Sequence, residues 1–170
     1  MNIPLYRDAF DHHVWGTLRL IDACSGLSPE QLAASASGTY GSILDTFRHI
    51  AAADSSYLFV LTAGAVHPID EEHLELPEIR SVMERFGEDW SEVLTQDPDP
   101  EAVLVRRRDD GSETHAPIGI RLAQVIHHGS DHRSQICTTL TSLGIEPPGI
   151  DVWEFGLASG RSEERLPPSS

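Results

Sequence analysis

The sequence predicts an all-α protein, a four-helix bundle with a long crossover connection and a small β-hairpin before the last long helix. Three observations lead to this prediction. Apolar residues recur at helical spacings in four long segments. A long acidic connection follows the second segment, as a crossover between parallel neighbours requires. An Asp-Gly turn between two short runs precedes the fourth segment and is typical of a hairpin.

The first helix is expected over residues 5–23, where Leu5, Phe10, Val14 and Leu18 form an apolar stripe. His12 and His13 lie within it. We interpret both as boundary residues rather than as groups that approach a functional site. Ser28 and Pro29 then predict a short helical turn, because serine is a favoured N-cap and proline fits the first position of a helix.

The second helix is expected over residues 42–62 and the third over residues 76–95, since both keep the helical period. Pro77 suits the first position of the third helix, and Pro98 ends it. The connection between these helices, residues 64–77, is long and acidic. Loops of this length in a compact domain are often functional.

The hairpin is expected over residues 102–116, and the fourth helix follows from about Leu122 to Leu143, with Gly144 just beyond its end. The hairpin carries three consecutive arginines, Arg106 to Arg108. Two aspartates follow them directly, so we interpret the run as part of a solvated hairpin rather than as a nucleic-acid patch.

The length predicts one domain, which we place at residues 1–158, followed by a polar tail over residues 159–170 that we expect to be disordered. Residues 151–155 are expected to form a last half-turn that packs on the bundle. The start of the chain lacks the basic and apolar regions of a signal peptide, and we expect a cytoplasmic protein.

Composition limits the partners of the chain. A formal net charge of −15 argues against nucleic acid, which needs a basic surface. No apolar run has the length that a membrane span requires, so no membrane partner is expected. The two cysteines are too few for a disulfide scaffold and are expected to be buried thiols in a reducing compartment.

The fourth helix contains three histidines, and their spacing separates them. At about 100° per residue, His128 and His132 lie about 40° apart on one face, whereas His127 points to the opposite side. Histidines four residues apart can converge on a metal ion. Two ligands do not make a site, however, and two polar boundary residues are the alternative interpretation.

The segment from His128 to Ile136, His-Gly-Ser-Asp-His-Arg-Ser-Gln-Ile, resembles the signature of the DinB / YfiT-like metalloenzymes. Ser134 is a departure, because the family often has glycine there. The pair His49-Ile50 in the second helix resembles the other marker of the family. The resemblance implies a metal triad of His49, His128 and His132. Periodicity alone places His49 roughly 140° from the buried face of its helix, so its assignment rests on the resemblance.

Three histidines and an open coordination position are typical of a catalytic metal site, and imidazole ligands suit zinc or nickel. The resemblance implies an enzyme that uses a low-molecular-weight thiol in an S-transfer to small electrophiles, and it also implies a homodimer. A metal-dependent hydrolase, a non-catalytic metal-binding dimer for stress response and a helical interaction module with incidental histidines are the alternatives.

The sequence identifies no catalytic side chain, and the reacting group would be a metal-bound water or thiolate. Arg133 and Asp54 are candidates for a supporting role. A buried arginine needs a carboxylate partner, and we favour a structural salt bridge over a substrate clamp for Arg133. Asp54 either orients a ligand histidine or pairs with an arginine, and we favour the pairing. Gln135 is a further candidate for contact with the groove.

Overall fold

The computed structural model describes residues 3–165, and within them the fold is mostly helical, with six helices and one two-stranded antiparallel hairpin. The elements are α1 (Ile3–Cys24), α2 (Pro29–Leu32), α3 (Ile43–Leu61), α4 (Leu76–Thr95), β1 (Val103–Arg107), β2 (Glu113–Pro117), α5 (Ile118–Ser142) and α6 (Val152–Ala158). The mostly helical class, the hairpin and the short turn at α2 are thereby confirmed.

Local sequence explains where these helices begin. Ser28 opens α2 with a capping box, in which its side chain accepts from the Gln31 amide and the Gln31 side chain accepts from the Ser28 amide. Ser42 caps α3, because its hydroxyl accepts from the amide of Asp45 at 3.0 Å. Side-chain acceptors therefore satisfy amides that the first turn of each helix leaves unpaired.

Three helices, α1, α5 and α6, are longer than the sequence predicts. Helix α5 begins at Ile118 rather than near Leu122, because the amides of Ile118 and Gly119 donate to the carbonyls of Ala102 and Pro100, each at 2.9 Å. These partners lie before β1, so periodicity within the helix gives no sign of them. Instead of a half-turn, α6 is a seven-residue helix whose N-cap is Asp151.

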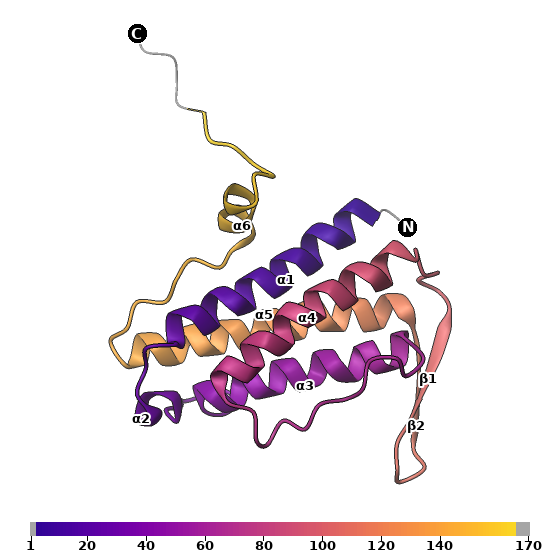
Figure 1. The fold of residues 1–170 in the computed structure, drawn as a ribbon, viewed down its shortest axis with the longest axis horizontal. Coiled ribbons are helices and arrows are strands. Elements are labelled where there is room, and N and C mark those ends of the chain that lie inside the picture. The colour runs from indigo at the N-terminus through magenta and orange to yellow at the C-terminus, as the bar shows by residue number, and fades with distance from the viewer. Residues whose placement is uncertain (1–2, 166–170) are drawn as a thin grey trace.

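The four long helices enclose one core. Helix α1 packs against α4 and α5, while α3 packs against the same two helices. Helices α3 and α4 run in the same direction, and residues 62–75 return along the outside of α3 to connect them (Figure 1). The large apolar side chains buried in this core include Phe10, Leu20, Phe47, Ile50, Met83, Phe86 and Trp90. No helix within residues 3–165 is long and apolar enough to cross a bilayer.

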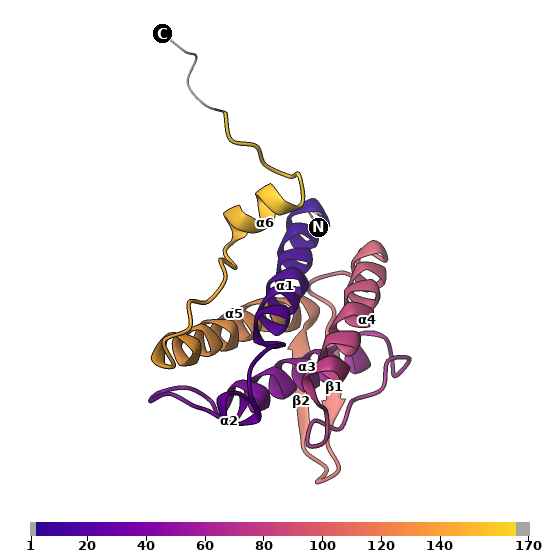
Figure 2. The same cartoon turned by 60° about the vertical axis from the view of Figure 1, so that its left-hand side comes forward.

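Helix α6 lies over α1, on the opposite side of the long helices from the hairpin (Figure 2). Its Phe155 ring packs 5.6 Å from the ring of Trp15. The chain keeps contacts beyond α6, since the Ser162 amide donates to the Gly156 carbonyl and Arg161 pairs with Asp8 at 2.8 Å. Residues 166–170 of the predicted tail lie outside the described residues.

Candidate metal centre

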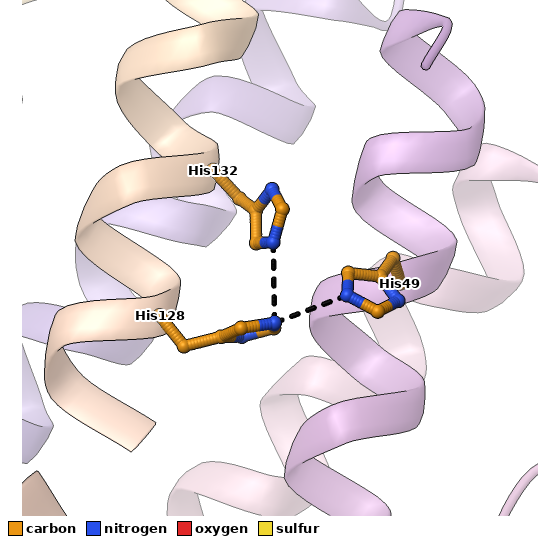
Figure 3. Close-up of side chains that lie close together, drawn as sticks. All are labelled: His49, His128 and His132. Atoms are coloured by element: carbon orange, nitrogen blue, oxygen red, sulfur yellow. Dashed lines mark hydrogen bonds between the residues drawn. The ribbon is translucent and has the colours of Figure 1, made fainter. Parts of the chain in front are cut away.

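Three histidines meet between α3 and α5 with their rings pointing toward one another (Figure 3). His49 comes from α3, and His128 and His132 come from successive turns of α5. The Nε2 atom of His128 lies 3.1 Å from Nε2 of His49 and 3.1 Å from Nε2 of His132. The structure therefore brings together the two histidines selected by spacing and the one selected by resemblance.

The spacing of these nitrogens fits a metal ion. Zinc binds imidazole nitrogen at about 2.0–2.1 Å, so two nitrogens of a tetrahedral site lie about 3.3–3.4 Å apart. The observed separations of 3.1 Å are close to that value. A set of three imidazoles without a thiolate is typical of sites that keep a position open for an exogenous ligand. The donor set and its convergence thus suit a divalent metal.

His49 reaches the centre because α3 has neighbours on two sides. Phe47 and Ile50 are buried in the core, while the side of the helix that carries His49 is only partly covered and faces α5. The predicted angular position of His49, away from the apolar face of its helix, therefore agrees with the structure. Periodicity could not identify it as a candidate ligand, because the position of α5 beside this face is a property of the tertiary fold.

Gln135 orients one of the three converging histidines. Its Oε1 atom lies 3.1 Å from Nδ1 of His132 and accepts from the backbone amide of Tyr40 at 2.9 Å. An amide oxygen only accepts, so Nδ1 of His132 carries its proton and Nε2 presents a lone pair toward the other two histidines. The same oxygen also joins α5 to the loop before α3.

Tyr40 was not anticipated from the sequence, where it lies in a short polar loop. Its ring stacks on His49 with centroids 4.1 Å apart and an interplanar angle of 16°, and its edge approaches His132 at 5.2 Å. The side chain remains 53% exposed. The Tyr40 ring therefore packs against His49 and His132 on one side of the site and remains open to solvent.

The long connection before α4 also contributes to the site. An Oε2 atom of Glu71 lies 3.8 Å from Nδ1 of His49. Burial is the largest influence on the His49 imidazole and lowers its pKa, the charge of His132 lowers it further, and Glu71 opposes both. At 3.8 Å this contact is electrostatic rather than a hydrogen bond, and the carboxylate favours positive charge on the ring.

His128 has the most strongly shifted pKa of the three converging histidines. Burial, followed by the neighbouring His132 and His49, lowers the pKa of its imidazole to about 4. A lowered pKa means that this ring is neutral at neutral pH. Because metal ions bind the neutral imidazole, protons do not compete strongly for this position.

A buried polar network lies beside the centre and corrects one prediction. His13 was expected at the boundary of α1, but its side chain is 0% exposed. Arg133 Nη1 donates to His13 Nδ1 at 2.8 Å, and His13 Nε2 in turn donates to Oδ2 of Asp54 at 2.9 Å. Trp90 donates to the same oxygen at 3.2 Å. The boundary prediction was wrong because α1 packs on two helices, so more of its surface is covered than one stripe indicates.

The network also shows how Arg133 and Asp54 are used. Both are almost fully buried, with 2% and 1% exposure. The carboxylate partner expected for Arg133 is separated from it by a neutral His13, so the two charges are joined through an imidazole rather than in a direct salt bridge. Asp54 hydrogen-bonds His13 and Trp90, not one of the three converging histidines.

Gly129 lets this network approach α5. A Cβ atom at this position would lie 2.3 Å from Cε1 of His13 and 2.9 Å from Nη1 of Arg133, both too short for contact. Glycine is unfavourable in the interior of a helix. Its position between His128 and His132 was therefore a signal, readable from the sequence, of a close approach by another side chain.

Neither thiol of the chain is activated. Burial raises the pKa of the Cys24 thiol to about 12, and it also raises the pKa of Cys137. A reactive cysteine needs a lowered pKa and an electropositive, accessible environment. The expectation of a buried thiol holds fully for Cys24, while Cys137 is partly exposed.

Fold and site together define a helical protein with a candidate three-histidine metal centre. Comparison with protein families matches residues 1–164 to the DinB family, and the chain belongs to this family. A search of curated proteins finds no match.

The bond between Gln135 and His132 predicts a measurable effect on metal affinity. Replacing Gln135 with alanine is expected to weaken zinc binding by about 10–100-fold, because His132 loses the acceptor that fixes its tautomer and ring orientation. Gln135→Glu keeps an acceptor and is expected to retain most of the affinity. Competition with a chromogenic chelator measures both, and Gln124→Ala, at an exposed position of the same helix, is the control. Equal affinities for Gln135→Ala and the control would contradict the proposed role of Gln135.

Proposed function

We propose that the protein is a metal-dependent enzyme that transfers a low-molecular-weight thiol to small electrophiles, with zinc or nickel held by His49, His128 and His132. The observation that supports this most directly is the convergence of three histidines from two helices, with Nε2 of His128 lying 3.1 Å from Nε2 of each of the other two. Membership of the DinB family supports the metal centre. The raised pKa of both cysteines supports an external thiol, because the chain supplies no activated one.

The metal would supply Lewis acidity and lower the pKa of a thiol or water ligand toward neutrality. The chain itself lowers the pKa of His49 and His128 through burial, and Gln135 orients the His132 ring. Tyr40 limits access on one side. In the transfer, the thiolate sulfur forms a bond to an electrophilic carbon, and the leaving group departs with the bonding electron pair. Arg133 and Asp54 serve as positioning residues, since both are buried in the network that fixes α5.

The same proposal includes two architectural points. The four long helices and the return of residues 62–75 along α3 support a four-helix bundle with one long crossover. We also propose a homodimer, which light scattering of the purified protein tests. A dimer would leave the chemistry at the centre unchanged, because all three ligands come from one chain.

A turnover assay tests the proposed reaction. Protein loaded with zinc or nickel is incubated with 1-chloro-2,4-dinitrobenzene and a panel of thiols, and product absorbance is followed against a metal-free sample. We expect a rate that requires both metal and thiol and that disappears in His132→Ala. Hydrolysis of p-nitrophenyl acetate without a thiol would favour the hydrolase instead. Metal binding without either reaction would favour a non-catalytic role and would overturn the proposal.

A further inference from the structure

A second cavity lies between the C-terminal half of α3, the beginning of the connection that follows it, and β1. Its volume is about 690 Å³, within the range of about 300–1,000 Å³ that is typical of small-molecule sites. None of the three histidines lines it, and neither do Tyr40, Glu71 or Gln135. It is therefore separate from the metal centre, and an inference from it does not depend on the proposed reaction.

One part of this cavity is apolar. Phe59 of α3 and Val105 of β1 both line it, and each is 39% exposed. Val60 adds further apolar surface from α3. Large apolar side chains that line a concave surface while open to solvent provide the contact area that binds the body of a ligand.

The other part is basic, although the whole chain carries a formal net charge of −15. Arg106, Arg107 and Arg108 line the cavity together with one carboxylate, Asp109. Arg107 is neutralised by Glu113 at 2.6 Å. The side chain of Arg108 donates to the hydroxyls of Ser112 and Thr114, which are neutral. Within residues 3–165, the side chain of Arg106 makes no hydrogen bond or ion pair, although its backbone pairs with Thr114 in the hairpin. Two guanidinium groups at the cavity thus have no bonded carboxylate.

A further positive charge lies beneath the hairpin. Arg121 of α5 is 5% exposed, and its Nη2 atom donates to the carbonyls of Leu104 at 2.8 Å and Thr114 at 3.0 Å. Its Nε atom is buried without a hydrogen-bond partner. Burial lowers the pKa of Arg121, Tyr57 opposes this, and the charge of Arg106 contributes a smaller lowering. The guanidinium groups of Arg106 and Arg121 therefore repel each other, and an anion beside Arg106 would relieve that repulsion.

We propose that this cavity binds a small organic anion with an apolar body, such as an aromatic or aliphatic carboxylate or sulfonate. The apolar body packs between Phe59 and Val105. The anionic group accepts charge-assisted hydrogen bonds from Arg106 and Arg108, whose planar guanidinium groups match carboxylate and sulfonate oxygens. The arginine run of the hairpin, interpreted from the sequence as solvated, is in this proposal the anion-binding half of the site.

Two fluorescent probes of similar shape test the proposal with the full-length protein. 8-Anilinonaphthalene-1-sulfonate carries the anionic group, and N-phenyl-1-naphthylamine has the same ring system without it. We expect the sulfonate to bind more tightly to the wild type. Arg106→Gln is expected to weaken sulfonate binding about tenfold and to leave binding of the neutral probe unchanged, because only a charge-assisted contact is lost. Phe59→Ala is expected to weaken the binding of both probes.

The controls separate this cavity from other exposed surfaces. Arg85→Gln removes an exposed guanidinium on α4, and Trp153→Ser removes the large exposed ring on α6. Neither change is expected to alter the affinity for the sulfonate. Amide chemical shifts in a ¹H–¹⁵N spectrum should move in residues 56–64 and 105–109 on titration. Equal sulfonate affinity in Arg106→Gln and the wild type, or shifts confined to α6, would overturn the proposal.

Discussion

Replacing His132 with alanine is expected to weaken metal binding by more than about 100-fold, which exceeds the loss typical of an outer contact. His132 supplies one of three nitrogens that converge within 4.8 Å of one another, and no further histidine, cysteine or acid of the described residues joins that group. Its removal leaves two ligands, too few to hold a catalytic metal. Elemental analysis of protein purified without a metal-binding tag, wild type beside variant, measures the effect.

His127→Ala is the matched control for this loss. His127 lies on the same helix, next to a proposed ligand, but it is exposed and belongs to the opposite face. The control should keep about one equivalent of metal, while His49→Ala and His128→Ala should behave like His132→Ala. Loss of metal in the control as well, or its retention in any of the three ligand variants, would show that the convergent histidines are not the binding site.

Replacing Asp54 with alanine is expected to lower the free energy of unfolding by about 3–5 kcal/mol, the cost of removing one member of a buried charge pair. The substitution leaves the buried Arg133 without a compensating charge. It also leaves His13 Nε2 and Trp90 Nε1 without the carboxylate oxygen that accepts from both. Urea denaturation followed by circular dichroism measures the change, since a domain of this size has a limited total stability.

Asp131→Ala provides the comparison for that measurement. Asp131 is an exposed carboxylate on α5, and its removal should change the free energy of unfolding by no more than about 0.5 kcal/mol. Asp54→Asn removes the charge at nearly constant volume and separates loss of charge from loss of packing. If Asp54→Ala and Asp131→Ala unfold at the same urea concentration, the buried network contributes nothing to stability.

Periodicity and capping residues predicted the helical parts of the fold because these signals are local. Ser28, Ser42 and Pro77 mark the beginnings of three helices within one or two residues of the observed positions. The start of α5 was placed too late, because its first amides donate to residues before β1. Contacts between segments that are distant in the chain do not appear in the period of either segment.

Some residues of the candidate site were likewise predicted from local patterns, whereas others come together only in the tertiary fold. The spacing of His128 and His132 on one helix is a local property and was enough to select them. His49 required resemblance to a family, since it becomes a neighbour of the pair only through the packing of α3 on α5. Tyr40 and Glu71 lie in connections, where no periodicity predicts which way a side chain points. His13 was misjudged because one apolar stripe cannot reveal a second buried face.

The converging histidines come from segments that are distant in the chain. His49 and His128 are 79 positions apart, so an ion bound to both would close a loop that contains all of α4 and the hairpin. Closing a loop of this length has an entropic cost that grows only with the logarithm of its length. Because packing already holds α3 beside α5, the folded chain has lost this conformational entropy before any ion binds. An ion that binds only this folded form would therefore stabilise it in proportion to the logarithm of the ion concentration once the site is nearly saturated.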